Sequence, residues 1–170
     1  WTAGKVILTA AGEDDKSGVV KYEYKLQDGE WTTGNVATVD KNQTVGFRVT
    51  DAAGNVAETF VDVTNIDKAD PIVSISGNTS KWTNQNIILT GSAVDHESGV
   101  GELYHSFDNI NWIKGATVQV AENGKVFFKA VDNVGNEKVE FVDKDKQSLE
   151  IVKFNLQSVK QNIEPKFKDA

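Results

Sequence analysis

Pairs of oxygen-bearing side chains recur along this sequence at a spacing that suits a bound cation. An aspartate and an asparagine lie four residues apart in two D-x-x-G-N segments, and further aspartates lie near the junction between the two copies. The candidate ligands are Asp51, Asn55, Asp67, Asp70, Asp132 and Asn136. Calcium takes six to eight oxygens at a flexible site, so calcium is the cofactor this set predicts, although the spacing is not that of an EF-hand. A simpler interpretation stays open, because an Asp that opens a turn and a Gly in the left-handed region explain D-x-x-G-N without an ion.

Two tryptophans form the second candidate site. Trp31 and Trp112 each follow a short polar segment that is typical of a tight turn. A pair of exposed indoles can stack on sugar rings, which predicts a carbohydrate ligand. The alternative is packing in the core or at a sheet edge, because a small domain needs large apolar anchors.

Catalytic chemistry is not indicated by the motifs. The sequence has no Cys, and its two histidines, His96 and His105, are nine residues apart, which is not a zinc-ligand spacing. It contains no G-x-S-x-G, phosphate-binding loop or dinucleotide fingerprint. Paired carboxylates abound in an acidic protein and do not by themselves nominate a glycosidase. We therefore expect no enzymatic activity and no catalytic residues.

Charge and composition exclude other functions. Lys plus Arg number 18 and Asp plus Glu 25 in 170 residues, a net charge of −7, which argues against nucleic acid or anionic membrane as a partner. No apolar run is long enough for a membrane span, so we expect no membrane insertion. Because Met is absent and the sequence begins at Trp1, we expect it to be a piece of a longer protein.

An internal repeat organises the chain. When the sequence is shifted by 81 positions, residues 1–62 align without a gap on residues 82–143, and 21 of the 62 pairs are identical. Average composition gives roughly four identities by chance. The identities cluster in segments typical of turns, D-x-x-S-G at Asp14–Gly18 and Asp95–Gly99 as well as D-x-x-G-N. We interpret D-x-x-S-G as a loop in which Asp and Ser cap the backbone, and the chain as two copies of one unit.

Short strands separated by turn residues account for each copy. In the second copy the expected strands are residues 72–76, 86–93, 100–107, 111–113, 117–121, 125–131 and 137–142. Asn123-Gly124 predicts a type I′ turn and a hairpin between the two strands that flank it. Seven short strands without a helical period favour a two-sheet sandwich of the immunoglobulin type, with a closed barrel as the competing architecture.

Domain boundaries follow from the repeat and from one proline. A polar stretch ends at Pro71, which cannot donate to a central strand ladder. We expect a first domain over residues 1–67, a second over 68–146 and an extension, or the start of a further unit, over 147–170. The first domain has no counterpart of the strand at 72–76 and therefore lacks its opening strand. The alternating segment Leu149–Leu156 predicts a strand in the extension.

These motifs together resemble a known family. The segments Ser17–Tyr24, Asp28–Trp31, Phe47–Val56 and Asn65–Lys68 are similar to the tandem bacterial Ig-like repeats of large cell-surface and secreted proteins. The resemblance covers residues 1 to about 143. The second copy departs from it at Asn109–Asn111, where the first has Asp28–Glu30.

The resemblance implies a setting and a function. Such repeats form all-β rods that act as stalks or adhesive arrays, which implies a non-enzymatic spacer or binding surface on an exported bacterial protein, located outside the cell or in the cell wall. The implied partners are neighbouring Ig-like repeats and an extracellular protein or carbohydrate. Some adhesins of this class bind calcium at linkers, which agrees with the acidic set. The alternative is an accessory, non-catalytic region of a secreted carbohydrate-active enzyme.

Overall fold

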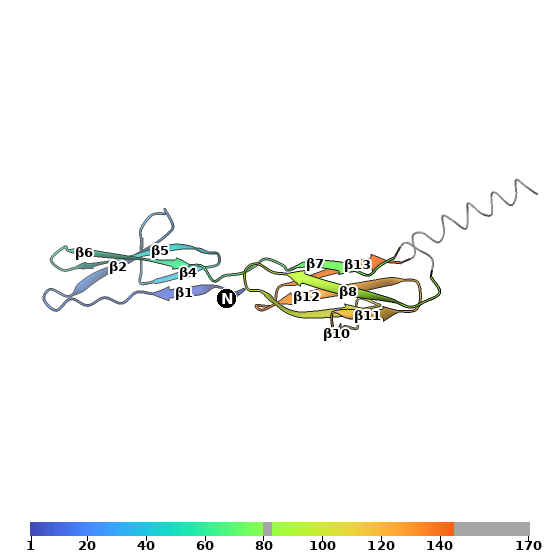
Figure 1. Ribbon diagram of the computed structural model, residues 1–170. Helices are drawn as coiled ribbons and strands as arrows, with labels where there is room; N and C mark the ends of the chain where they lie inside the picture. The colour runs from blue at the N-terminus through green and yellow to red at the C-terminus, as the bar shows by residue number, and fades with distance from the viewer. Residues whose placement is uncertain (80–82, 145–170) are drawn as a thin grey trace, which may run out of the picture. The chain divides into compact units, whose positions relative to one another are not determined.

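The computed structural model of the protein describes residues 1–79 and 83–144. This part of the chain consists of thirteen strands, the turns between them and no helix (Figure 1). Contacts divide the chain into two units. Unit 1 is Trp1–Ala69 with Asn133–Asn136, and unit 2 is Asp70–Asp132 with the residues from Glu137 onward. The strand expected at Leu149–Leu156 and the extension over 147–170 lie outside the described residues.

Unit 1 contains two antiparallel sheets. β1 (Val6–Thr9) pairs with β4 (Val36–Val39) in a two-stranded sheet. The second sheet has the order β3-β2-β5-β6, and its strands are β3 (Thr32–Thr33), β2 (Val19–Leu26), β5 (Gln43–Asp51) and β6 (Val56–Val63). The side chains buried between the sheets are Ala37, Val39, Val45, Phe47, Val63 and Ile66.

The two ends of unit 1 are hydrogen-bonded to each other. Thr2 forms an isolated parallel bridge with Ile66. Its amide donates to the carbonyl of Asn65 and its carbonyl accepts the amide of Asp67, both at 2.9 Å. Entry and exit of the chain in unit 1 are therefore joined directly.

Unit 2 has one more strand. A three-stranded sheet has the order β11-β8-β7, with β7 (Ile72–Ser76), β8 (Ile87–Val94) and β11 (Thr117–Val120). The other sheet has the order β10-β9-β12-β13, with β9 (Val100–Ser106), β10 (Ile113–Lys114), β12 (Lys125–Asp132) and β13 (Glu137–Asp143). Its core consists of Ile87, Leu89, Val118, Val120, Val126 and Phe128.

Alternation of side chains explains how the sheets face each other. Along β12, Val126, Phe128 and Ala130 are buried, while the residues between them point to the other face. Phe128 has no exposed surface, and it packs against Gly91 of β8 in the opposite sheet. Each unit is an immunoglobulin-like β-sandwich, and among the described residues unit 1 has no strand at the position of β7. The separate sheets exclude the closed barrel.

Six of the seven expected strands of the second copy are confirmed within one residue at each end, and β7 matches residue for residue. The short strand expected at 111–113 lies instead at Ile113–Lys114. The hairpin at Asn123-Gly124 is wrong. β11 and β12, which flank this dipeptide, belong to different sheets, so the connection crosses the sandwich. Gly124 has a φ of 148°, but Asn123 does not have the positive φ of a type I′ turn. Both flanking strands bury alternate side chains in the same core from opposite sides, which rules out pairing between them.

Candidate functional site

The D-x-x-S-G loop of unit 1 is closed by its aspartate. Asp14 Oδ1 accepts the amides of Lys16 (3.1 Å), Ser17 (2.6 Å) and Gly18 (2.8 Å). Gly18 has a φ of 77°, which only a residue without a Cβ adopts at no cost. These amide hydrogen bonds, with that from Gly18 the largest, lower the pKa of Asp14. The loop is therefore self-supporting.

The D-x-x-G-N segment of unit 1 is the turn of the β5–β6 hairpin. Asp51 Oδ1 accepts the Asn55 amide at 2.8 Å, and Oδ2 accepts Asn55 Nδ2 at 2.7 Å. Gly54 takes the left-handed position, with a φ of 89°. The Asn55 side chain is the main cause that lowers the pKa of Asp51. The turn interpretation accounts for these two residues.

The structure brings the two acidic motifs together. β2 begins beside the end of β5, with Val19 paired to Asp51, and the Ala52 amide donates to the Gly18 carbonyl at 3.0 Å. The Ser17 hydroxyl donates to Asp14 Oδ1 at 3.2 Å, and Ser17 also lowers the pKa of Asp51, whereas the charge of Asp14 raises it. Neither motif by itself predicts this meeting, because it depends on the register between β2 and β5.

Unit 2 repeats this arrangement with deeper burial. Asp95 accepts the amides of Gly99 (2.6 Å) and Glu97 (3.2 Å). Asp132, at the end of β12, is only 4 % exposed. Carboxylate oxygens of Asp95 and Asp132 lie within 4.8 Å of each other. Two oxygen donors are therefore paired at this end of unit 2.

The other predicted cation ligands lie apart from the Asp51 turn. Asp67 is fully buried, its Oδ1 accepts the Ala69 amide at 2.9 Å, and its carbonyl accepts Asn136 Nδ2 at 3.4 Å. Asp70 is exposed. Within unit 1, the eight residues of β6 separate the Asp51 turn from Asp67, about 27 Å at the usual rise per residue. Asp51 and Asp67 therefore cannot share one ion within unit 1.

Trp31 packs on cations at the outer face of its sheet. The Arg48 guanidinium lies 4.4 Å and Lys25 Nζ 5.0 Å from the ring centroid. Arg48 also donates to the nearly buried Glu23 at 2.6 Å, and Lys21 pairs with Glu23 at 2.7 Å. The Arg48 bond is the main cause that lowers the pKa of Glu23 to about 2. Trp31 thus covers a network of charged side chains that spans several strands.

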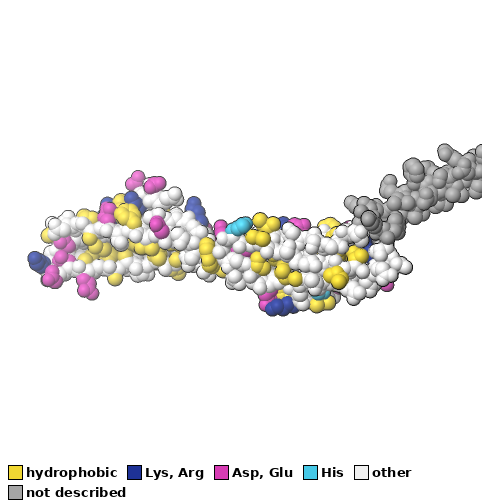
Figure 2. Space-filling model, viewed as in Figure 1, with side chains coloured by type: hydrophobic (Ala, Val, Ile, Leu, Met, Phe, Trp, Pro, Cys, Tyr) yellow, Lys and Arg dark blue, Asp and Glu magenta, His cyan; other side chains and the backbone are white. Residues whose placement is uncertain are grey.

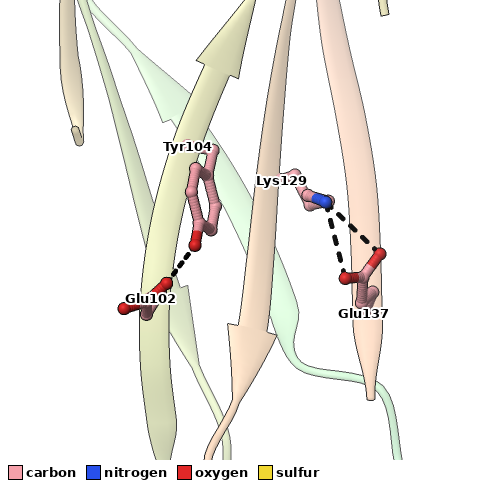
Figure 3. Close-up of polar contacts among 4 residues, drawn as sticks. All are labelled: Glu102, Tyr104, Lys129 and Glu137. Atoms are coloured by element: carbon pink, nitrogen blue, oxygen red, sulfur yellow. Dashed lines mark hydrogen bonds and ion pairs between the residues drawn. The ribbon is translucent and has the colours of Figure 1, made fainter. Parts of the chain in front are cut away.

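Trp112 occupies the same place in unit 2. Lys129 Nζ lies 5.1 Å from the Trp112 ring centroid and 5.3 Å from that of Tyr104. Figure 3 shows the polar contacts around it: Tyr104 donates to Glu102, and Lys129 pairs with Glu137 at 3.4 Å. The pair Trp112–Lys129 is the 81-residue counterpart of Trp31–Arg48. Neither indole belongs to a hydrophobic core; both are half-buried beside the short edge strands β3 and β10.

The histidines differ in their surroundings. His105 is buried, its Nδ1 lies 3.2 Å from the Gly115 carbonyl, and its ring packs near Phe128. His96 is exposed. His105 therefore acts as a packed, hydrogen-bonded side chain of unit 2.

Each unit has a hollow in its surface among the described residues. One, of about 460 Å³, is lined by Phe107 and Gln119–Val126 in unit 2. The other, of about 500 Å³, is lined in unit 1 by Gly12–Asp15, Val19 and Tyr22, and the Tyr22 hydroxyl donates to the Gly12 carbonyl at 3.0 Å. No helix that could span a membrane occurs in the part of the chain that the structure describes.

Comparison with known proteins gives no family. No family model matches the chain, and no curated protein matches it. Among solved structures, the chain is similar to one described as "Structure of amphioxus IgVJ-C2 molecule", with 13 % identity, a TM-score of 0.39, and coverage of 84 % of this chain and 96 % of that chain. This distant likeness says nothing about ligands. The fold follows from the strand order of the described residues, which is that of two immunoglobulin-like sandwich units.

Proposed function

We propose that the chain is a non-enzymatic structural and adhesive module of an exported bacterial surface protein. Its sandwich units act as spacers or present a binding surface to an extracellular protein or glycan, next to neighbouring Ig-like repeats. The observation that carries this proposal is that the acidic side chains bond to neighbouring groups of the fold itself. Asp14, Asp51, Glu23, Glu102 and Asp108 all have a lowered pKa, caused mainly by bonds that close turns or cross strands.

A lowered carboxyl pKa suits structure better than acid catalysis. A general acid at neutral pH needs a raised pKa, which burial in an apolar pocket supplies. The acids named above are instead held ionised by hydrogen bonds and cations. This supports a role in keeping two small sandwiches rigid rather than in turning over a substrate.

Variants of Trp31 and Trp112 test whether the chain binds glycans. If the two indoles form the glycan-binding surface, titration of the wild type with several polysaccharides should quench its tryptophan fluorescence. The variants Trp31→Ala and Trp112→Ala should each lose part of the response, while Trp1→Ala should keep it. If the tryptophan fluorescence of the wild type does not change with any glycan, the glycan-binding role is excluded and the spacer role is kept.

The second candidate function is an accessory region of a secreted carbohydrate-active enzyme. The observation that favours it is the recurrence of a half-buried Trp over a cation at matching positions in both units. Such a region should raise the activity of a linked catalytic domain on insoluble polysaccharide and leave its activity on soluble substrate unchanged. Equal activity on both substrates with and without this region would exclude that role.

We also propose that calcium binds at the acidic turns. Paired oxygens of Asp95 and Asp132 in unit 2 support a partial ligand set there, and the bonds of Asp51 to Asn55 leave the turn in unit 1 satisfied without an ion. Millimolar calcium should therefore raise the melting temperature of the wild type, and Asp132→Asn should reduce this rise more than Asp51→Asn does. An unchanged melting temperature between chelator and calcium would exclude the site.

A further inference from the structure

The connection between β11 and β12 contains Asn123-Gly124, the only Asn-Gly dipeptide of the sequence. It does not form the hairpin turn that this dipeptide predicts. Asparagine is a thermolabile residue, because a main-chain nitrogen can attack its side-chain carbonyl carbon. The attack is least hindered when the next residue is a glycine, which has no Cβ beside that nitrogen. The dipeptide therefore places a nucleophile and an electrophile next to each other.

Both reacting residues lie open to water. Asn123 is exposed, and it lines the hollow of about 460 Å³ in unit 2 together with Gly124. Gly124 has a φ of 148°, and a Cβ placed on it would meet no atom of the described residues within 4 Å. Water therefore has access to this part of the connection, and no described side chain shields it.

Hydrogen bonding leaves the two groups free to approach each other. Among the described residues, neither the Gly124 amide nor the Asn123 side chain forms a hydrogen bond, and the Gly124 carbonyl accepts one from the Lys144 amide at 3.3 Å. The Asp-Gly dipeptide of unit 1 is different, because the Gly29 amide donates to the Leu26 carbonyl at 2.9 Å. Within the described part of the chain, the Gly124 nitrogen breaks no hydrogen bond when it attacks.

Unit 1 provides an internal comparison. The 81-residue shift places Asn42 at the position of Asn123. Asn42 Nδ2 donates to the Ile66 carbonyl and its Oδ1 accepts the Ile66 amide, both at 2.8 Å. The residue after Asn42 is Gln43, the first residue of β5, instead of a glycine. Asn42 is thus held by two hydrogen bonds, whereas its counterpart in unit 2 is exposed beside a glycine.

We propose that Asn123 is a site of spontaneous deamidation, with water as the only co-reactant. The Gly124 nitrogen forms a bond to Asn123 Cγ, the bond from Cγ to Nδ2 breaks, and ammonia leaves with the proton of the Gly124 amide. The product of this step is a succinimide ring, which a water molecule then opens. Attack of water on Cγ restores the original main chain and leaves an aspartate. Attack on the main-chain carbonyl leaves an isoaspartate, in which the main chain runs through Cβ and Cγ.

The position of the site makes the two products differ in their effect on unit 2. Val120 and Val126 lie on either side of the dipeptide, are buried in the core, and belong to different sheets. An isoaspartate adds one atom to the main chain between them, whereas an aspartate keeps its length. Both products add one negative charge, and Figure 2 shows that acidic side chains already lie at the surface of each unit. The isoaspartate product therefore destabilises unit 2 and leaves unit 1 unchanged.

The test is incubation of the full chain at neutral and at alkaline pH, followed by peptide mapping with mass spectrometry. The peptide that contains Asn123 should gain the mass difference between water and ammonia. The gain should be faster at alkaline pH, because the attack requires loss of the Gly124 amide proton. The peptide that contains Asn42 should keep its mass. Isoaspartate should appear beside aspartate, since only the ring gives both, and Asn123→Gln should abolish the change.

The variant Gln43→Gly separates the effect of the dipeptide from that of the structure. It creates a second Asn-Gly dipeptide at the equivalent position of unit 1, where the two hydrogen bonds to Ile66 hold the side chain of Asn42. In the folded variant Asn42 should therefore stay intact while Asn123 reacts, and in urea both should react. Equal reaction of the two asparagines in the folded variant would overturn the structural part of the argument.

Hydrogen exchange measures the consequence for unit 2. Aged wild type that contains isoaspartate should exchange the amides of β11 and β12 faster than fresh protein, with no change in unit 1. Asn123→Asp carries the same charge without the added atom and should exchange like fresh protein. Two results would overturn the proposal itself: Asn123 that keeps its mass in the folded chain but reacts in urea, or a product that is aspartate alone.

Discussion

The substitution Gly91→Ala tests how closely the two sheets of unit 2 approach each other. A Cβ on Gly91 would lie 2.3 Å from Phe128 Cδ1 and 3.0 Å from two further ring carbons. Phe128 has no exposed surface, so its ring has no open space to move into. Overpacking a core in this way costs typically about 1–3 kcal/mol. For a domain of this size, each kcal/mol lowers the melting temperature by roughly 4–8 °C.

Urea denaturation with hydrogen exchange as the readout separates the two units. Gly91→Ala should lower the free energy of unfolding of unit 2 and leave unit 1 unchanged. The matched control is Ala10→Gly. Ala10 and Phe47 of unit 1 correspond to Gly91 and Phe128 of unit 2 under the 81-residue shift, and Ala10 packs against the core cluster that contains Phe47. Ala10 directly follows β1, and its replacement by Gly should destabilise unit 1 by roughly 0.5–1 kcal/mol, the usual backbone-entropy cost of Gly in place of Ala.

A second substitution identifies the cause. Phe128→Leu removes the ring, so Gly91→Ala/Phe128→Leu should be less destabilised than the sum of the single variants. A neutral or stabilising effect of Gly91→Ala would refute the steric argument. The stability gained because Ala has less backbone entropy than Gly in the unfolded chain would then exceed any steric cost in the folded core. Strictly additive effects in the double variant would likewise show that the two side chains do not compete for space.

Three further predictions concern unit 1. Phe47→Ala should destabilise it by about 3–5 kcal/mol, measured in urea, since the ring is nearly buried in its core; a loss under 1 kcal/mol would contradict the described packing. Glu23, whose pKa is lowered from 4.5 to about 2, should contribute stability that is present above about pH 4.5 and is lost as pH falls toward 2. Glu23→Gln should therefore flatten the pH dependence of unfolding in this range, and an unchanged slope would exclude Glu23 as its source. Asp14→Ala should speed exchange of the Gly18 amide, while Asp15→Ala should not, and equal effects would contradict the loop geometry.

The strands were predictable because their signals are local. Alternation in β12 and turn residues around β7 depend on neighbours within a few positions, and both strands are found where the sequence places them. The Asn123-Gly124 hairpin failed because a turn dipeptide does not report which sheet each flanking strand joins. Burial of Val120 and Val126 from opposite sides decides that, and it depends on the whole sandwich.

The candidate site was predictable only in part, for a similar reason. The hydrogen bonds of Asp51 and Asn55 follow from turn chemistry. The approach of Asp14 to Asp51 requires the pairing of β2 with β5 and the register shift between Val19 and Lys21, which no short motif encodes. The cation over Trp31 is equally non-local, since Arg48 comes from a strand that follows a loop and β4.

The parallel bridge between Thr2 and Ile66 has a mechanical consequence. In a spacer under tension, the chain is pulled at its entry and exit in opposite directions. Because Thr2 runs parallel to the exit segment, such a pull loads its two backbone bonds, to Asn65 and Asp67, in shear, so they must break together rather than one after the other. Forced unfolding depends on the rate of such a rupture rather than on equilibrium stability. Removal of residues 1–3 should therefore lower the unfolding force of unit 1 in single-molecule pulling by more than it lowers the melting temperature.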